Sequence, residues 1–312
     1  ECFALGAKIE IEKPIFTVGG GAANAAVTFA RQGFKTAMAA KIGDDAAGEG
    51  VLGDLKKEKI VSLVRFDQRG TAYSSILLSP SGERTILVYR GASDDLRVSD
   101  IAASRLKARW VYLVPGRIPF SGMFTLMRRV RKNGARIAMN PSSHYLKMGA
   151  RKLAPLLREL DVILVNREEA AMLTGMPYGN EKGIFKKFDA LVKGIAVMTE
   201  GSKGALVSDG THIYRAGTFK GKVVDRTGAG DAFGSGFVAG LMAHGKGQRA
   251  RARGERKRAQ FAPSDLQFAI RLGTANATSV VERIGAQEGI LTRSAFRAQA
   301  RFRRLVVRIS AL

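Results

Sequence analysis

Short apolar segments alternate with longer amphipathic segments along most of this 312-residue chain. Apolar runs of four or five residues lie at 110–114, 135–139, 162–165 and 195–198, and a further short run lies at 36–42. Runs of this length, bounded by turn residues, are typical of strands buried on both faces. Stretches of helical length separate them, at 22–33, 46–59, 120–132, 150–160, 168–173 and 181–192. Strands that alternate with helices predict βαβ units and a parallel sheet.

Two segments depart from this alternation. Residues 72–78 and 85–89 have strand composition on either side of a Pro-Ser-Gly-Glu turn at 80–83, which predicts a β-hairpin. A hairpin beside a parallel sheet suggests a small lid or a dimer flap. Residues 204–224 indicate short strands with a turn at Asp209-Gly210. The last third is expected to be helical, at 229–244, 264–283 and 292–303.

The composition argues against several kinds of site and against a membrane-spanning protein. The single cysteine, Cys2, excludes an internal disulfide and a cysteine-based zinc site, and three scattered histidines argue against a His-rich metal site. No apolar run approaches the roughly 18 residues of a transmembrane helix, and the first residues do not have the pattern of a signal peptide. We therefore expect a cytoplasmic protein with no membrane partner.

The net charge of +24 is concentrated near the C-terminus. Residues 245–262 contain seven basic residues and one Glu, and residues 289–312 contain six Arg and no acidic residue. Such charge fits a solvated loop and tail, or a patch for nucleic acid. No aromatic residues are interleaved to form a stacking platform, so the solvated loop is favoured. We expect 245–262 to be a basic insertion.

The strongest chemical motif is Val-Val-Asp-Arg-Thr-Gly-Ala-Gly-Asp-Ala-Phe at 223–233. A strand end passes into Gly228-Ala229-Gly230 and then into a helix. Free backbone N–H groups at a helix start, together with the helix dipole, can form an anion hole. Asp231 in the first turn could accept a proton from a hydroxyl that attacks a phosphoryl group. The structural alternative is a glycine-rich turn whose Asp stabilises the helix dipole.

Three further strand ends carry polar or glycine-rich turns. Gly20 and Gly21 precede a helix containing Asn24, a side chain that can donate and accept hydrogen bonds to a polyhydroxyl ligand. Asn166 and Glu169 directly follow the run at 162–165; they could organise phosphate and hydrated Mg²⁺, or form a capping box. Thr199 and Gly201 follow the run at 195–198 and could hold nucleotide phosphates, or form a simple link between strands. The carboxyl ends of parallel strands are where open α/β sheets bind ligands.

Taken together, these four motifs resemble the PfkB family of carbohydrate kinases, which has the ribokinase-like fold. The family's first signature resembles the segment GGGAANAAVTFARQGFKTAMAAKIGDDAAG, and its second resembles DRTGAGDAFGSGFVAGL. NREE and TEGSKG lie between them, where the family has its magnesium and nucleotide motifs. The resemblance runs from about residue 16 to residue 286. It implies a single α/β kinase domain, 1–312, with a central mostly parallel sheet flanked by helices and a small β lid at about 5–18 and 71–90.

The resemblance also implies roles for residues. Asp231 would be the catalytic base, and Gly228, Ala229 and Gly230 the anion hole. Gly20, Gly21 and Asn24 would bind the acceptor substrate. The nucleotide site would contain Asn166, Thr199, Gly201 and Gly204, and Glu169 would hold Mg²⁺ through water. Asp225 and the Thr227 carbonyl would bind a monovalent cation such as K⁺, near the turn at 283–289.

The chain departs from the family pattern at several places. Gly234 stands where Asn is frequent, and the insertion at 245–262 is longer and more basic than expected. The first strand of the family, whose Asp binds the acceptor hydroxyls, has no counterpart before Cys2, so we expect that strand to be missing here.

The predicted function is ATP-dependent transfer of the γ-phosphate to a primary hydroxyl of a sugar. The alternative on the same fold is a nucleoside kinase of the adenosine kinase type. A nucleic-acid-binding protein and a non-catalytic sugar sensor are further alternatives, and the complete motif around Asp231 argues against the sensor. A homodimer formed through the lid is a possible assembly.

Overall fold

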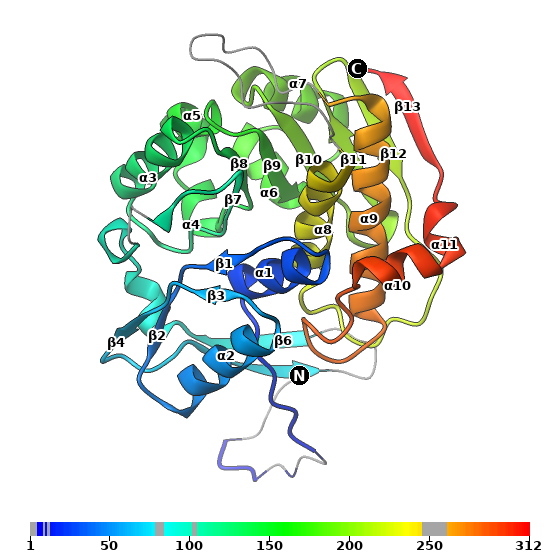
Figure 1. Ribbon diagram of the computed structural model, residues 1–312. Helices are drawn as coiled ribbons and strands as arrows, with labels where there is room; N and C mark the ends of the chain where they lie inside the picture. The colour runs from blue at the N-terminus through cyan, green and yellow to red at the C-terminus, as the bar shows by residue number, and fades with distance from the viewer. Residues whose placement is uncertain (1–4, 9, 11–12, 79–83, 102–104, 245–260) are drawn as a thin grey trace.

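A seven-stranded sheet forms the centre of the molecule in the computed structural model, which describes residues 5–8, 10, 13–78, 84–101, 105–244 and 261–312 (Figure 1). Its strand order is β13-β12-β11-β10-β9-β8-β7. β7 through β10 run parallel, and β11 to β13 continue the sheet in antiparallel pairs. The strands are β7 (Trp110–Leu113), β8 (Arg136–Met139), β9 (Val162–Asn166), β10 (Ile195–Thr199), β11 (Ala205–Ser208), β12 (His212–Ala216) and β13 (Val307–Ala311).

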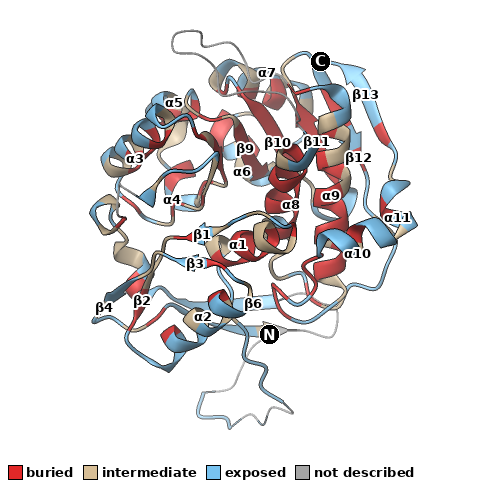
Figure 2. Ribbon diagram, viewed as in Figure 1, coloured by how far each residue is buried: buried red, intermediate tan, exposed pale blue. Residues whose placement is uncertain are grey.

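Helices cover both faces of this sheet. One face packs against α3 (Phe120–Lys132), α4 (Ser143–Leu146), α5 (Gly149–Leu157), α6 (Arg167–Thr174) and α7 (Glu181–Leu191); the other packs against α8 (Ala229–His244) and α9 (Pro263–Val281). In β9, Ile163 and Val165 enter the first core and Val162 and Leu164 enter the second. Because side chains alternate along a strand, a strand covered on both sides is apolar at every position. Figure 2 shows this buried centre.

The N-terminal part forms a smaller layer beside β7. It contains α1 (Gly21–Arg31), β1 (Ala37–Met38), β2 (Lys41–Gly43), α2 (Ala46–Lys57), β3 (Val61–Ser62) and β4 (Arg65–Asp67). β1 pairs with β3, and β2 pairs with β4, both in parallel. The short 3-10 segments η1 (Gly91–Asp95) and η2 (Val98–Asp100) lead from this layer to β7. The apolar run at 36–42, predicted as one strand, is thus divided between two sheets.

The predicted hairpin is present. β5 (Tyr73–Leu78) and β6 (Arg84–Tyr89) pair antiparallel, with Tyr73 opposite Tyr89. The turn at 80–83 lies outside the described residues. Every described residue of β6 is exposed, so this hairpin projects from the body as expected of a lid. The described residues between 5 and 18 form neither a helix nor a strand.

Helices α8 and α9 pack closely because glycines line their contact. A Cβ on Gly240 would lie 2.5 Å from the Ala269 Cα, and one on Gly236 would lie 3.0 Å from the Gly273 Cα. A buried polar network then joins these helices to α1: Ser235 Oγ donates to Thr28 Oγ1 at 2.9 Å. This network fixes α1 against the start of α8.

The predicted α/β fold is confirmed, with two differences near the C-terminus. The stretch 292–303 forms two short helices, α10 (Arg293–Ala298) and α11 (Ala300–Arg303), because Gln299 between them is extended at φ −90° and ψ 100°. β13 was not predicted at all. It is a short edge strand with a single buried residue, Val307, and it follows an arginine-rich stretch predicted as helix and charged tail.

The basic insertion predicted at 245–262 lies outside the described residues except for its last two. Phe261 is buried and stacks on Trp110 of β7, with ring centroids 6.4 Å apart. The Arg136 guanidinium lies 4.8 Å from the centre of the Phe261 ring. Phe261, the only aromatic residue of the predicted insertion, therefore anchors the start of α9. Within the described part of the chain, no helix is long and apolar enough to cross a membrane.

Candidate active site

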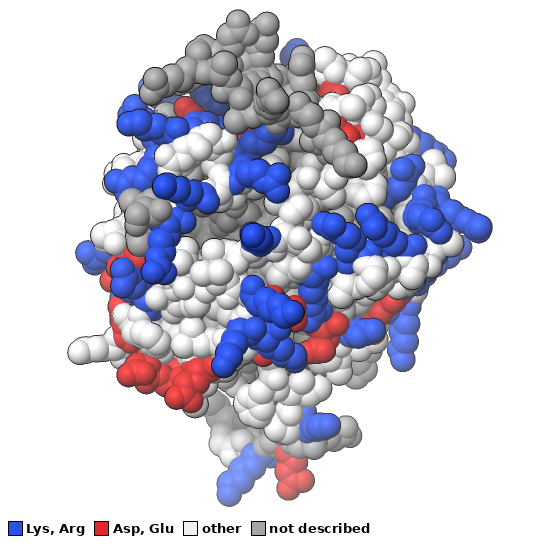
Figure 3. All heavy atoms as spheres, viewed as in Figure 1, with Lys and Arg blue, Asp and Glu red and all other residues white. Residues whose placement is uncertain are grey.

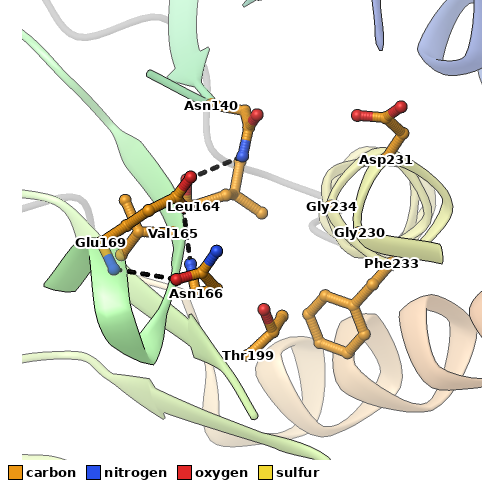
Figure 4. A pocket seen from close by; sticks show the side chains of 10 residues that line it. All are labelled: Asn140, Leu164, Val165, Asn166, Glu169, Thr199, Gly230, Asp231, Phe233 and Gly234. Carbon is orange, nitrogen blue, oxygen red and sulfur yellow. Dashed lines mark hydrogen bonds between the residues drawn. The ribbon is translucent and has the colours of Figure 1, made fainter. Parts of the chain in front are cut away.

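A cavity of about 160 Å³ opens where β8, β9 and β10 end and α8 begins. It has polar groups on two opposite sides (Figure 4). Its lining residues are Asn140, Leu164, Val165, Asn166, Glu169, Thr199, Gly230, Asp231, Phe233 and Gly234. Five of them belong to the residues predicted from the motifs. This is the position at which an open α/β sheet binds its ligands.

Asp231 lies in the first turn of α8, where Figure 4 shows its carboxylate on the α8 side of the cavity. Burial raises the pKa of this carboxyl, because removal from water disfavours the charged form. A hydrogen bond from Asn24 opposes the change in pKa: Asn24 Nδ2 donates to Asp231 Oδ2 at 2.9 Å. A carboxylate with a raised pKa is a stronger base, so this environment suits proton acceptance.

Asn24 is itself held in place. It is buried in α1, and its Oδ1 accepts a hydrogen bond from Gln287 Nε2 at 3.1 Å. This contact commits the amide oxygen to Gln287 and leaves the amide N–H group for Asp231. Arg31 Nη1 donates to the backbone carbonyl of Gln287 at 2.9 Å and so fixes the turn that carries it. Gln287 is a positioning residue that the sequence analysis missed, because a single Gln in a loop has no distinguishing pattern.

The two glycines at the start of α1, Gly20 and Gly21, let the chain approach Asp231. Gly20 has a φ of +92°, a conformation that favours glycine. A Cβ on Gly21 would lie 3.1 Å from Asp231 Oδ1 and 3.0 Å from Val114 Cγ1. The predicted acceptor residues and the predicted base therefore meet at one point.

Backbone N–H groups at the start of α8 face the same region. Gly228 has a φ of +77°, and a Cβ there would lie 2.6 Å from the Ala286 Cβ, so only glycine fits. The Ala229 N–H group turns back toward the Arg226 carbonyl at 3.3 Å. In the described part of the chain no backbone carbonyl accepts from the N–H of Gly230 or Asp231. These two amides are available to an anion at the helix start.

Asn166 and Glu169 form the predicted capping box and also line the cavity. Asn166 Oδ1 accepts from the Glu169 N–H at 2.8 Å, and Glu169 Oε2 accepts from the Asn166 N–H at 2.9 Å. Burial raises the pKa of the Glu169 carboxyl, and the neighbouring Glu168 adds to the shift. The two interpretations of this motif are therefore compatible, because the capping box uses neither the Asn166 amide Nδ2 nor the second carboxylate oxygen of Glu169.

The motif after β10 is divided. Thr199 lines the cavity, whereas Gly201 and Gly204 lie in the turn beyond it and are not among the lining residues. Gly204 has a φ of +101°, and a Cβ there would lie 2.1 Å from the Ala216 carbonyl oxygen. Glycine is therefore required at position 204 by the link between β10 and β11. An ion pair between Arg167 and Glu200 joins this turn to the one after β9.

Asp225 is buried beside the turn at 283–289, as the resemblance implied. Its Oδ1 accepts from the Thr227 N–H at 2.8 Å, and its Oδ2 accepts from the Gly285 N–H at 3.1 Å. Thr227 Oγ1 is buried and has no hydrogen-bond partner among the described residues. A buried oxygen without a partner in the residue whose carbonyl is the predicted ligand supports a cation site at Asp225 and Thr227. Among the described residues, no cluster of three or more His, Cys, Asp or Glu side chains could hold a metal ion.

Asn140 lines the cavity, and sequence reasoning missed it as it missed Gln287. It follows β8, and its Nδ2 donates to the Leu164 carbonyl at 3.0 Å. The signal was present, because Asn140 is a polar residue directly after a buried strand, as Asn166 is. Parallel strands bring both to the same edge.

Comparison with known proteins agrees with this geometry. The family described as "pfkB family carbohydrate kinase" matches residues 4–293. A ribokinase from Haemophilus influenzae is 30% identical, over 88% of this chain and 84% of its own length. A deoxyribokinase from Salmonella typhi is 30% identical over 72% of this chain and 74% of its own length. The solved structure of an Arabidopsis thaliana ribokinase with ribose and ATP superposes with a TM-score of 0.73 at 22% identity, covering 94% of this chain and 90% of that one.

The chain belongs to the pfkB family of carbohydrate kinases. It is therefore a phosphotransferase that acts on a hydroxyl group. The family, the ribokinase-like fold and the enzyme class predicted from the sequence are confirmed.

Proposed function

We propose that this kinase transfers the γ-phosphate of ATP to a primary hydroxyl of a carbohydrate, with Asp231 as the general base. The observation that supports this most directly is the pair formed by Asn24 and Asp231. It places a buried carboxylate of raised pKa next to the glycine-rich start of α1. Asn166 and Thr199, the residues predicted to contact nucleotide phosphates, line the same cavity from the ends of β9 and β10.

The chemical step needs few protein groups. The acceptor hydroxyl gives its proton to the Asp231 carboxylate, and its oxygen bonds to the γ-phosphorus. The bond between that phosphorus and the β–γ bridging oxygen breaks, and ADP leaves. The Gly230 and Asp231 N–H groups stabilise the charge on the transferred phosphoryl group, since phosphoryl transfer depends mainly on positioning and electrostatics.

The nucleotide enters from the β9 and β10 side. Asn166 and Thr199 contact its phosphates, and Gly201 and Gly204 shape the adjacent turn. Glu169 would hold Mg²⁺ through water, because one of its carboxylate oxygens already accepts a hydrogen bond from the Asn166 N–H group. Mg²⁺ commonly keeps several waters in sites of this kind and supplies charge neutralisation between the β- and γ-phosphates.

Asp225 and Thr227 are proposed to hold a monovalent cation such as K⁺. The carboxylate is buried and the Thr227 hydroxyl has no partner in the described part of the chain. Because this turn leads directly into Gly228, a bound cation would stabilise the start of α8. Replacing KCl by NaCl or by tetramethylammonium chloride at constant ionic strength tests the site, and equal rates in all three salts would contradict it.

A phosphotransfer assay tests the main proposal. Purified protein is incubated with Mg²⁺–ATP and single acceptors from pentoses, hexoses, sugar acids, sugar phosphates and nucleosides. We expect ADP release that depends on a carbohydrate and is abolished in Asp231→Asn. Activity with nucleosides alone would favour the nucleoside kinase alternative, and ADP release with no acceptor dependence would contradict both.

The lid is proposed as a dimer contact. Several large apolar side chains of β5 and β6 are exposed, among them Leu87 at 60% and Val88 at 56%. Exposed apolar patches on a sheet edge are typical of interfaces. Sedimentation equilibrium of Leu87→Lys against wild type tests this; a monomeric wild type would contradict it.

A further inference from the structure

A second cavity, of about 120 Å³, lies beyond the ends of β7 and β8 and has a different chemistry. It is open to solvent, and cationic and hydroxyl side chains line it. These are Arg90, Arg117, His144, Lys147, Ser142 and Ser143. None of the motifs discussed above uses any of these residues.

The two cavities are connected through two strand ends. Ser142 lies two residues beyond Asn140, which lines the first cavity, and its Oγ donates to the Gly116 carbonyl at 2.5 Å. Gly116 in turn lies two residues beyond Val114, the residue that faces Gly21 beside Asp231. Two residues of chain span at most about 7 Å. The linings of the two cavities are therefore joined by short stretches of chain in the turns after β7 and β8.

The second cavity lies on the acceptor side of the site. The polar groups that face the phosphates of the nucleotide come from the ends of β9 and β10, whereas this cavity is built by the ends of β7 and β8. Arg90 adds a contribution from the lid, because it directly follows β6. A group bound here would contact the body and the lid together.

The charge of this cavity is positive. Its lining contains Arg90, Arg117 and Lys147 and no acidic residue. Arg117 is partly neutralised, since its Nη1 lies 3.3 Å from Asp94 Oδ2. For Arg90 and Lys147 no ion pair is found with any described residue. Figure 3 shows Lys and Arg side chains over the α3 and α4 side of this view, and Asp and Glu gathered near β2 and β4.

We infer that the acceptor is an anionic sugar, with a phosphate or carboxylate group that binds Arg90 and Lys147 at the end remote from the phosphorylated hydroxyl. Arginine, lysine and serine hydroxyls are the donors that bind such groups, and arginine can do so with two parallel hydrogen bonds. A neutral sugar would place no opposite charge against these two cations. The inference rests on the proposed kinase function and specifies its substrate class.

Matched acceptor pairs test this inference. Fructose 6-phosphate is compared with fructose, and gluconate with glucitol, so each pair differs mainly in the anionic group. We measure kcat/KM for each acceptor with wild type and with Arg90→Gln/Lys147→Gln. The control, Arg129→Gln/Lys152→Gln, removes the same charges from exposed positions on α3 and α5. Thermal unfolding confirms that both variants are folded.

We expect at least one anionic acceptor to exceed its neutral partner by about tenfold or more in kcat/KM. If fructose 6-phosphate exceeds fructose, the anionic group is a phosphate; if gluconate exceeds glucitol, it is a carboxylate. The Arg90/Lys147 variant should lower kcat/KM for that acceptor by about 10- to 100-fold, the range for hydrogen bonds to charged groups. The same variant should change the neutral partner less than about threefold, and the control should change neither.

Other results overturn the inference while leaving the kinase proposal intact. One is equal or better use of the neutral sugars by wild type. Another is a rise in the KM for ATP in Arg90→Gln/Lys147→Gln without a loss of kcat/KM for the acceptor, which would assign the cavity to the nucleotide. If no acceptor of any class is phosphorylated, the kinase proposal fails. Calorimetric titration of fructose 6-phosphate and gluconate then still tests the cavity, and equal affinity in wild type and Arg90→Gln/Lys147→Gln overturns the inference.

Discussion

The Asn24 side chain donates a 2.9 Å hydrogen bond to the Asp231 carboxylate, although the two residues are 207 positions apart in the chain. Each lies in the first turns of a helix that follows a glycine-rich segment. The contact depends on the packing of α1 against α8, which the buried hydroxyls of Thr28 and Ser235 fix. It joins the proposed acceptor site to the proposed base.

Replacing the proposed base tests the mechanism directly. Asp231→Asn keeps the size of the side chain and removes its ability to accept a proton. We expect kcat to fall by roughly 10²- to 10⁴-fold, with the Kd for Mg²⁺–ATP changed less than about threefold. Steady-state kinetics and nucleotide titration measure the two quantities. Near-wild-type turnover in a folded variant would remove Asp231 from the mechanism.

The pH dependence of kcat should report the contact between Asn24 and Asp231. The carboxylate acts as a base only when ionised, so the rate falls as the pH drops through its pKa. Burial raises that pKa, and the Asn24 hydrogen bond lowers it. Removing the donor in Asn24→Ala therefore moves the acid limb of the pH–rate profile to higher pH.

Gln287→Leu supplies a graded comparison for this pH dependence. The substitution frees the Asn24 amide to rotate, so we expect a smaller shift of the acid limb in the same direction. An acid limb that stays at the wild-type position in Asn24→Ala would show that Asp231 does not control the profile. A shift in Asn24→Ala without any in Gln287→Leu would remove Gln287 as a positioning residue.

The proposed Mg²⁺ role of Glu169 can be separated from its capping role. Glu169→Gln keeps a capping box, because Gln serves at this position as well as Glu, but it removes the charge. We expect a higher Mg²⁺ concentration for half-maximal rate and a nearly unchanged melting temperature. Glu49→Gln, at an exposed position in the first turn of α2, is the control and should leave the Mg²⁺ dependence unchanged. An identical Mg²⁺ titration for both variants would leave Glu169 with a structural role alone.

The glycines of α8 should be irreplaceable for steric reasons. Gly240→Ala would place a methyl group 2.5 Å from the Ala269 Cα, a backbone atom that cannot move freely. We expect a loss of about 1–3 kcal/mol in the free energy of unfolding, typical of overpacking. Gly53→Ala in α2 meets no atom within 4 Å and should gain about 0.5–1 kcal/mol, because alanine favours helices. Urea unfolding of the two variants compares them, and equal stabilities would show that the helix contact can relax.

Local pattern determined the fold class and most of the elements. The apolar runs that became β7 to β10 are continuous because those strands are covered on both faces, and their length excluded helices. The glycine-rich turns at Gly20 and Gly228 could be located because positive φ angles restrict the residue type. Local pattern did not identify β13, because this five-residue edge strand buries one residue and follows an arginine-rich stretch, and it failed at Gln299, where one extended residue divides a helix.

The site could be predicted only as separate motifs, and tertiary structure decided which of their residues meet. Asn166, Thr199, Gly230 and Asp231 line one cavity because parallel strands end at the same edge of the sheet. Gly204 instead serves a turn, since the Ala216 carbonyl leaves no room for a side chain. Gln287 and the cationic cavity around Arg90 and Lys147 carry no sequence signature. Their positions follow from long-range packing, which brings residues from distant segments together and which no local pattern encodes.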